Sequence, residues 1–577
     1  MKRLFLTITA LLMFVATMSA GGKLTLPDIT SGKFAAKTVN GINPIEGTDT
    51  YARISQDGER VVCCSFKTGK ELSVLFDVKN TMGCKIDGFD DYVLSPDGKR
   101  MLIQTKTERI YRRSFKADFY IYNIESRRLD RLSDGDKQQI PTWSPDGQQV
   151  AFVRGGNIFL VKLLYDNAEI QVTKDGKFNE VINGLPDWVN EEEFGFNSAL
   201  TFNADGTMIC WIRYDESKVK TYSLEMYKGM KPAKEEYAAY PGFYSYKYPK
   251  AGEDNSTVSA WSYDIKSHKI NRLQVPLDAD GYMPRIKPTN DPMRIVVYTM
   301  NRHQDDLCLY AVNPRSTVAQ LIIKEHVDKY VREEAMEGVK FVGDKILLPS
   351  DRSGYTKLYI YNMNGQLQRT IGDGNYDITS VYGYDPKTGD VYYQAAALGA
   401  TDRQVYVTHK NGKTVRLTDR EGWNTAFFSG DFQYFVNTWS DYNTPYVFTT
   451  RTREGKVINT IEDNKAVKQL VSDYGFCKRE PFSFTTSEGV VLNGWMVKPK
   501  DFDANKKYPV IMHQYSGPGS QQVTNSWSAG SMGQGGAFDS YLAQEGFIVV
   551  SVDGRGTGGR GSEFEKCTYL NQIGRAS

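Results

Sequence analysis

Short apolar runs recur along most of the chain, each directly after a polar turn of one kind. The turns have the form Ser/Asn-x-Asp-Gly, and the runs that follow them hold three or four consecutive apolar residues. Asp can cap its own turn and Gly accepts a positive φ, so each copy predicts a tight turn between two antiparallel strands. The four clearest turns lie at residues 55–58, 95–98, 144–147 and 203–206.

The spacing of these turns indicates a repeat. Their first residues are 40, 49 and 59 positions apart, and weaker copies near residues 343, 386 and 429 follow at 43-residue intervals. Aromatic strands recur between the turns. Four strands in 40–50 residues is typical of one blade of a β-propeller, so the region from about residue 50 to 470 predicts roughly eight blades. A stack of unrelated β-sandwiches is disfavoured because the turn repeats so regularly.

The pattern changes near Pro481. Two strands with a hairpin turn between them come first, then an apolar strand, a helix capped by Gly546, and a second apolar strand expected to be buried on both faces. A strand–helix–strand order of this kind is typical of the opening of an α/β domain. The expected elements are strands 482–485, 490–497, 508–514 and 547–552, and a helix at 537–545.

The first twenty residues have the pattern of an export signal. Lys2 and Arg3 precede an apolar run at 4–15, and small residues follow at 16–20. A transmembrane anchor is disfavoured because the run is shorter than the roughly 20 residues that a span needs. We therefore expect residues 1–20 to be a signal peptide, the mature protein to be periplasmic or secreted, and no membrane span to remain after cleavage.

Composition narrows the classes of function. The net charge is +2, with 40% hydrophobic and 24% charged residues, so no basic surface for nucleic acid is expected. Seven cysteines are scattered without a CxxC pair, which argues against a zinc site, and one or two disulfides are left open. No motif for another metal or for a cofactor is found. These features favour an exported, β-rich protein that acts on or binds a non-nucleic-acid partner.

Three local motifs resemble the dipeptidyl peptidase IV family of prolyl-oligopeptidase-type serine exopeptidases. They are the glutamate motif Asp-Trp-Val-Asn-Glu-Glu-Glu-Phe at 187–194, the arginine-bearing strand Tyr-Arg-Arg-Ser-Phe-Lys-Ala-Asp-Phe at 111–119, and the loop Gln-Tyr-Ser-Gly-Pro-Gly at 514–519. The strand end Val-Asp-Gly-Arg-Gly at 552–556 follows in the family's order. This resemblance implies a mainly β fold with a roughly eight-bladed β-propeller followed by the start of an α/β-hydrolase domain.

The resemblance also implies roles for four residues. Glu192 and Glu193 would bind the free α-ammonium group of a peptide, and two adjacent carboxylates can indeed accept its three N–H donors. Arg112 would contact a substrate carbonyl, although the neighbouring Arg113 leaves the register open by one residue. Tyr515 would donate its hydroxyl to the oxyanion of the tetrahedral intermediate. A solvated acidic helix face, a surface arginine and a packed core tyrosine are the structural alternatives.

The nucleophile of such an enzyme is not found. No G-x-S-x-G motif occurs, and the nearest match, at 529–533, lacks the first glycine and precedes the strand after which the motif is expected. His513 lies within a predicted strand ahead of that point, and the other four histidines fall in the propeller. We therefore expect the chain to be C-terminally truncated, with the Ser-Asp-His triad absent and no activity as given.

Two classes of function remain. One is a serine dipeptidyl aminopeptidase that releases X-Pro or X-Ala dipeptides from peptide N-termini, with a tripeptidyl relative left open and homodimers possible for the full-length form. The other is a non-catalytic propeller that binds peptide N-termini or a protein partner. A WD-like scaffold is disfavoured because it has no use for an oxyanion donor. The expected segments are 1–20 (signal), 21–50 (packing on the hydrolase domain), 51–475 (propeller) and 481–577 (incomplete hydrolase domain).

Overall fold

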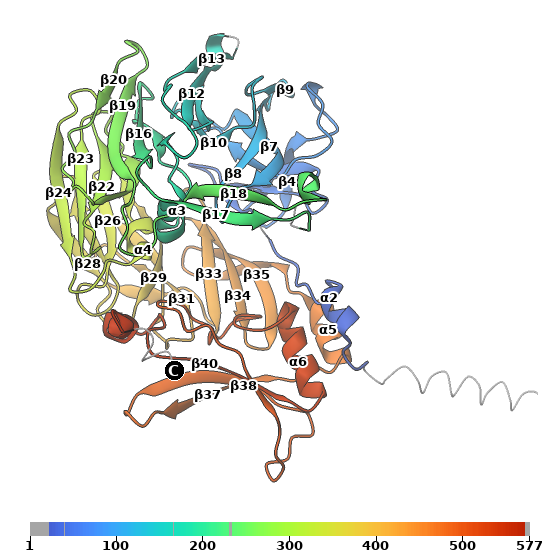
Figure 1. Cartoon of the computed structure of the whole chain (residues 1–577). Coiled ribbons are helices and arrows are strands. Elements are labelled where there is room, and N and C mark those ends of the chain that lie inside the picture. The colour runs from blue at the N-terminus through green and yellow to red at the C-terminus, as the bar shows by residue number, and fades with distance from the viewer. Residues whose placement is uncertain (1–21, 40, 166, 230–232, 572–577) are drawn as a thin grey trace, which may run out of the picture.

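The computed structural model describes residues 22–39, 41–165, 167–229 and 233–571. The expected signal peptide at 1–20 lies outside the described residues. The chain forms two lobes, a large one built almost entirely of sheets and a smaller mixed one below it in Figure 1. Mainly β structure is thereby confirmed.

Eight successive sheets of the described chain form the blades of the propeller, which confirms the number expected from the repeat. The first blade consists of β1 (Asn43–Pro44), β2 (Thr50–Ile54), β3 (Arg60–Ser65) and β4 (Glu71–Asp77). The second consists of β5 (Met82–Gly83), β6 (Asp91–Leu94), β7 (Arg100–Arg109), β8 (Phe115–Asn123) and β9 (Arg128–Arg131). The third consists of β10 (Gln139–Trp143), β11 (Gln149–Arg154), β12 (Asn157–Lys162) and β13 (Ala168–Gln171).

The fourth blade departs from the simple pattern because it carries two insertions. Its strands are β14 (Val181–Asn183), β15 (Leu200–Phe202), β16 (Met208–Asp215), β19 (Thr257–Asp264) and β20 (Ile270–Arg272). Helix α3 (Trp188–Phe194) lies between β14 and β15, and a separate hairpin, β17 (Thr221–Met226) with β18 (Gly242–Lys247), lies between β16 and β19. The larger insertion lengthens the spacing after residue 206, and the turn of the fifth blade, at residues 289–294, has Thr-Asn-Asp-Pro in place of the repeated motif.

The last four blades are regular. The fifth consists of β21 (Tyr282–Pro288), β22 (Ile295–Met300), β23 (Asp306–Val312) and β24 (Ala319–His326), and α4 (Glu333–Glu337) follows it. The sixth consists of β25 (Lys340–Val342), β26 (Lys345–Ser350), β27 (Lys357–Asn362) and β28 (Leu367–Ile371). The seventh consists of β29 (Ile378–Asp385), β30 (Asp390–Ala395), β31 (Gln404–Thr408) and β32 (Thr414–Arg416), and the eighth of β33 (Trp423–Phe428), β34 (Tyr434–Asp441), β35 (Thr444–Thr452) and β36 (Val457–Glu462).

The repeated polar turn lies where the sequence predicts it, between antiparallel strands. In the copy between β6 and β7, the Ser95 hydroxyl donates to Asp97 at 2.6 Å and accepts the Arg100 N–H at 2.9 Å. Gly98 completes the turn with φ +68°, a conformation that side chains rarely adopt. These hydrogen bonds satisfy the polar groups of the turn, and the apolar residues that follow it pack in the core of the blade.

The ring closes through contacts between the eighth and first blades. The Asn459 side-chain amide donates to the Thr68 carbonyl at 2.9 Å, and Val436 packs in one apolar cluster with Tyr51 and Val62. Closure leaves no open sheet between the first and last blades, so the propeller is a rigid frame for residues on its inner loops.

The smaller lobe is a four-stranded sheet with the order β37-β38-β40-β39 and flanking helices. Its strands are β37 (Arg479–Thr485), β38 (Val491–Val497), β39 (Val510–Met512) and β40 (Ile548–Asp553), and β39 and β40 are parallel. Helices α5 (Lys465–Asp473) and α6 (Ala537–Gln544) belong to this lobe, and α7 (Ser562–Glu565) lies near the end of the described chain. The predicted strand at 508–514 is shorter than expected, because β40 alone flanks it and Val510 and Met512 are 59% and 60% exposed.

The N-terminal segment packs on this lobe. Helix α2 (Leu26–Thr30) contacts α6, and the Leu24 N–H donates to the Gln544 side chain at 2.9 Å. Phe34 packs edge-to-face against Tyr474. Since β1 comes soon after this segment, the described residues start on the small lobe, run through the whole propeller and return to the small lobe.

Buried charge pairs hold the two lobes together. Lys566 lies 2.6 Å from Asp351 on the propeller and donates to the Tyr330 carbonyl at 2.7 Å. Next to it, Arg332 pairs with Glu565 at 3.0 Å, and Glu565 is 3% exposed. Because such contacts join both lobes, the loops on their facing sides have a defined relative position. No helix among the described residues is long and apolar enough to span a membrane.

All seven cysteines are free thiols. The disulfides left open by the sequence are therefore not formed in this structure.

Candidate functional site

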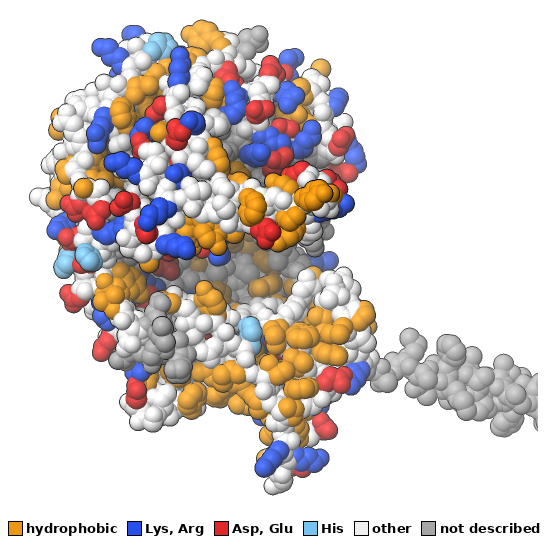
Figure 2. All heavy atoms as spheres, in the orientation of Figure 1, with side chains coloured by type: hydrophobic (Ala, Val, Ile, Leu, Met, Phe, Trp, Pro, Cys, Tyr) orange, Lys and Arg blue, Asp and Glu red, His pale blue; other side chains and the backbone are white. Residues whose placement is uncertain are grey.

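The glutamate motif folds into α3, on the side of the propeller that faces the small lobe (Figure 1). Asp187 begins the helix as its N-cap and accepts the Asn190 backbone N–H at 2.9 Å. Gly195 ends it in the left-handed conformation at φ +69°, with its N–H bonded to the Glu191 carbonyl. Figure 2 shows the surface hollowed between the two lobes. Because α3 has only seven residues, the caps Asp187 and Gly195 determine where the helix begins and ends.

The three consecutive glutamates have three different environments. Glu191 is 4% exposed, the Glu192 side chain is 21% exposed, and Glu193 is exposed. Successive residues of a helix point about 100° apart, which separates the buried member from the two accessible ones. The run is therefore not a uniformly solvated helix face.

Arg112 reaches the same place from the turn between β7 and β8. Its Nε lies 2.7 Å from Oε2 of Glu192, while the neighbouring Arg113 lies 4.0 Å from Glu333 on α4. Oε2 of Glu192 is therefore held by the Arg112 guanidinium in an ion pair. A carboxylate has two oxygens with about four acceptor sites, so Glu192 can accept a further donor, such as an ammonium group, while it pairs with Arg112.

Electrostatics distinguish the two accessible carboxylates. Protein atoms crowd the Glu193 carboxyl even though the residue is exposed, and this desolvation, followed by repulsion from Glu192, raises its pKa. The Arg112 pKa is raised by its contact with Tyr111 and by the charge of Glu192. Two carboxylates balanced by one guanidinium leave one negative charge, which favours binding of a cation.

An aromatic wall adjoins the helix. The Trp188 ring lies 4.3 Å from that of Tyr248, 5.9 Å from Tyr246 and 5.3 Å from Tyr111, measured between centroids. Tyr246 and Tyr248 belong to the second strand of the β17–β18 hairpin or directly follow it. The packing of these tyrosines against Trp188 was not predicted from the sequence. The available signal was the spacing of Tyr244, Tyr246 and Tyr248 by two residues, which places them on one face of a strand.

Tyr515 lies on the other lobe, in the loop after β39. Its side chain is 73% exposed. Asp553 holds the far end of the loop, where its carboxylate accepts the N–H groups of Gln522 at 2.8 Å and Val523 at 3.1 Å. No described hydrogen bond or ion pair joins Tyr515 to Arg112, Glu192 or Glu193. The structure thus brings the propeller residues together and places the tyrosine on the facing lobe.

At the near match to a nucleophile motif, residues 529–533, the described residues show no hydrogen bond between a serine and a histidine. The Ser531 hydroxyl donates to the Ser528 carbonyl at 2.8 Å, and no histidine bonds to it. His513 carries a buried Nδ1 without a hydrogen-bond partner. These residues form no Ser–His pair.

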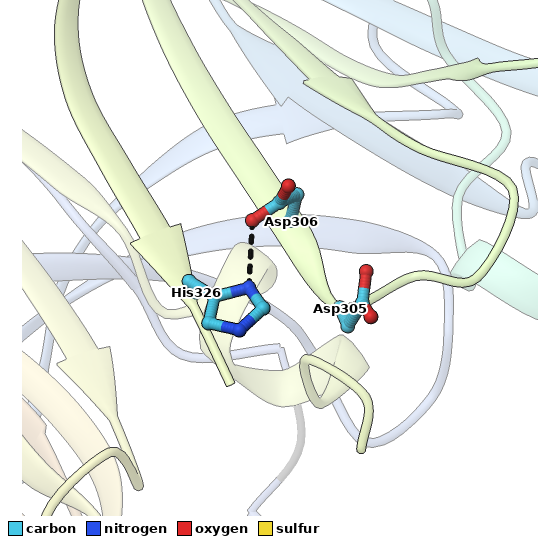
Figure 3. A group of neighbouring side chains, drawn as sticks. All are labelled: Asp305, Asp306 and His326. Carbon is cyan, nitrogen blue, oxygen red and sulfur yellow. Dashed lines mark hydrogen bonds and ion pairs between the residues drawn. The ribbon is translucent and has the colours of Figure 1, made fainter. Parts of the chain in front are cut away.

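One group of metal-ligand type occurs among the described residues, on the fifth blade, where Asp305 and Asp306 lie at the start of β23 and His326 at the end of β24 (Figure 3). Asp306 accepts from His326 Nδ1 at 2.8 Å and lies 3.2 Å from Lys324. Asp305 accepts from Asn301 at 2.6 Å. A lysine and an amide already neutralise and bind these carboxylates, so the group is explained by its own contacts.

We predict that the free energy of unfolding depends on pH through one buried carboxyl group, that of Glu216. Glu216, just after β16, is 5% exposed, and burial, followed by the charge of Asp187, raises its pKa from 4.5 to about 7. Between these values the folded protein keeps a proton that the unfolded chain releases, so the free energy of unfolding falls as pH rises from 4.5 to about 7. Glu216→Gln should remove this loss and stabilise the protein by up to about 3 kcal/mol at pH 8.

Urea unfolding of both proteins at pH 4, 6 and 8 measures the effect. The two proteins should agree at pH 4 and diverge as pH rises. A difference that stays constant with pH would show that Glu216 titrates normally.

Comparisons with known proteins match most of the chain. Residues 95–446 match the family model for the N-terminal region of dipeptidyl peptidase IV. The chain is 30% identical over 506 residues to a probable dipeptidyl peptidase 4 of Aspergillus flavus, covering 84% of this chain and 63% of that protein. It is 28% identical to dipeptidyl peptidase 4 of Trichophyton equinum, covering 83% and 62%. The chain therefore spans less than two thirds of the length of these relatives.

Two solved structures share the fold. The crystal structure of Porphyromonas gingivalis dipeptidyl peptidase 4 superposes with a TM-score of 0.90 at 38% identity, covering 96% of this chain and 77% of that one. A putative dipeptidyl aminopeptidase IV from Bacteroides ovatus superposes with a TM-score of 0.76 at 21% identity, covering 95% and 76%, and supports the fold alone.

Proposed function

Because this chain belongs to the dipeptidyl peptidase IV family, we propose that it recognises the free amino terminus of peptides as part of a serine dipeptidyl aminopeptidase. The observation that carries the proposal is the pair of adjacent carboxylates Glu192 and Glu193 on α3, both partly accessible, with Arg112 against Glu192. An α-ammonium group has three N–H donors and one positive charge, and it matches this pair in both respects.

Binding of the amine by such a pair determines which peptide bond of the substrate can be cleaved. Only a chain terminus carries an α-ammonium group, so internal peptide segments are excluded. If the amine is fixed at α3, the bond that reaches the reacting groups is set by the distance to them. If the cleaved bond follows the second residue from the amine, X-Pro or X-Ala dipeptides are released. In a tripeptidyl relative the cleaved bond would lie one residue farther from the amine.

Arg112 is proposed to hold the carbonyl of the substrate's first residue. Its Nε faces Glu192, and the side chain as a whole is 65% exposed, which leaves other N–H groups for a substrate. A guanidinium offers five donors in a planar fork, which suits a carbonyl next to the ammonium group. This assignment favours Arg112 over Arg113, whose guanidinium is directed to Glu333.

Tyr515 is proposed as the oxyanion donor. A phenolic O–H aimed at the developing negative charge stabilises the tetrahedral intermediate by several kcal/mol. The position of Tyr515 supports this role, because it follows the carboxyl end of β39, the edge of an α/β sheet where ligands commonly bind. Its exposure leaves the hydroxyl accessible to a substrate.

The nucleophile and general base are not identified within the 577 residues, which contain no G-x-S-x-G motif. We therefore propose that these residues bind peptide N-termini without hydrolysing them. A non-catalytic binding module is the second candidate function, favoured by a complete glutamate pair in a sequence without that motif. Export to the periplasm or the exterior and homodimer formation remain proposals that rest on the N-terminal pattern and on the family.

The first experiment compares turnover with binding. The purified 577-residue chain should not cleave a Gly-Pro chromogenic amide above background, because removal of the triad leaves little catalysis. The same preparation should bind a Gly-Pro peptide with a free amino terminus in a calorimetric titration. Turnover that a serine-directed reagent inhibits would locate a nucleophile inside these residues, and absence of binding would contradict the proposed recognition.

A further inference from the structure

The two halves of the proposed recognition site come from different blades. Arg112 lies in a turn of the second blade and Glu192 on a helix of the fourth, with the third blade between them in sequence. The ion pair that joins them involves an arginine side chain that is 65% exposed. Exposed pairs contribute little to holding two elements in place. Another contact must therefore fix the arginine turn against α3.

Glu191 makes that contact. Its Oε1 accepts the backbone N–H of Arg113 at 2.7 Å and that of Ser114 at 2.8 Å. The carboxylate is 4% exposed, so both bonds are shielded from water. Charge-assisted hydrogen bonds of this kind are roughly twice as strong as neutral ones. The residue directly before Glu192 thus binds the backbone directly after Arg112.

The turn needs an external acceptor at this point. Its own Ser114 carbonyl accepts the N–H groups of Ile110 at 2.9 Å and Tyr111 at 3.3 Å. The N–H groups of Arg113 and Ser114 point outward from the turn to Glu191. On the opposite side, the Asn197 side-chain amide donates to the Arg113 carbonyl at 2.9 Å. One residue within α3, Glu191, and one just after it, Asn197, therefore fix the peptide groups that flank Arg113.

We propose that Glu191 is a positioning residue that sets the distance between Arg112 and the pair Glu192–Glu193, and so sets the discrimination of free from blocked amino termini. The inference rests on the proposed function, since it assigns a role within the same site. Glu191 itself contacts no substrate, because its carboxylate is buried and used by the turn. It acts only through the backbone that carries Arg112.

The test is a double-mutant cycle in the 577-residue chain. The ligands are a Gly-Pro peptide with a free amino terminus and its N-acetylated counterpart, titrated by calorimetry. Glu191→Ala should weaken binding of the free peptide by roughly tenfold to a hundredfold. Glu191→Gln keeps an acceptor oxygen without the charge and should fall between Glu191→Ala and the unmodified chain.

The cycle separates positioning from a merely structural role. In an Arg112→Ala background the turn has no guanidinium left to place, so Glu191→Ala should cost little further affinity. A loss of the same size in both backgrounds would overturn the proposal, as would unchanged binding by Glu191→Ala. Melting temperatures recorded alongside identify any general loss of structure.

Two further variants keep the test decisive. If Glu191→Ala does not fold, Asn197→Ala removes the bond on the exposed side of the turn; its smaller loss should likewise vanish in the Arg112→Ala background, and additivity would contradict the proposal. Glu192→Ala distinguishes a failure of the proposed function from a failure of the positioning role of Glu191. If it leaves binding intact, the proposed function is wrong; if it abolishes binding while Glu191→Ala does not, only the positioning role is wrong.

Discussion

Replacing Glu192 by alanine is expected to weaken binding of peptides with a free amino terminus by roughly a hundredfold. The substitution removes one of the two adjacent carboxylates on α3 and leaves Arg112 without its ion-pair partner at 2.7 Å. The remaining Arg112 would then repel the substrate ammonium group. Calorimetric titration with a Gly-Pro peptide measures the loss directly.

Two controls define the result. Glu193→Gln removes the second charge, which is already disfavoured by desolvation, and should weaken binding less than Glu192→Ala does. Glu71→Ala removes a glutamate that likewise pairs with an arginine, Arg60 at 3.6 Å on the first blade, and should leave binding unchanged. Equal losses in Glu192→Ala and Glu71→Ala would point to a general electrostatic effect and contradict a specific site.

Loss of the helix cap is expected to have the second large effect. Asp187 is 5% exposed and accepts from the Asn190 N–H at 2.9 Å, from the Asn190 side chain at 2.8 Å and from the Ser256 hydroxyl. Asp187→Ala leaves three buried donors without an acceptor, which should destabilise α3 locally by about 2–4 kcal/mol. Because α3 is short and carries both glutamates, peptide affinity should fall as the helix opens.

Hydrogen–deuterium exchange across residues 188–195 measures this opening. Exchange should accelerate there and stay unchanged in distant blades. Asp187→Asn keeps one acceptor oxygen for the Asn190 N–H and should give a smaller effect. Unchanged exchange and affinity in Asp187→Ala would mean that packing of Trp188 and Phe194, rather than the cap, maintains the helix.

The sequence predicted the propeller because its information is local. Each turn satisfies its own polar groups within six residues, as in the network of Ser95, Asp97 and Arg100, so the turn can be recognised without a partner. The helix at 537–545 and the end marked by Gly546 were predicted for the same reason, and Gly546 has φ +93°. Local hydrogen bonding and backbone conformation are encoded in a few neighbouring residues.

The parts that sequence analysis missed depend on contacts between distant segments. Glu191 binds a turn 77 and 78 residues away, and nothing in its neighbourhood distinguishes it from Glu192. The hairpin partners of Trp188 come from an insertion whose placement only the folded blade determines. The choice between Arg112 and Arg113 likewise required coordinates, because adjacent residues in a turn can face either way.

The central claim is recognition of a free amino terminus, and paired titrations of the unmodified chain test it most directly. A Gly-Pro peptide and its N-acetylated counterpart differ only in the ammonium group, so their affinities isolate its contribution. The account predicts that the free peptide binds at least roughly tenfold more tightly, and that Glu192→Ala erases the difference. Equal affinities of the unmodified chain for the two peptides would contradict the account, because a site built from Glu192 and Glu193 would then have no ammonium group to bind.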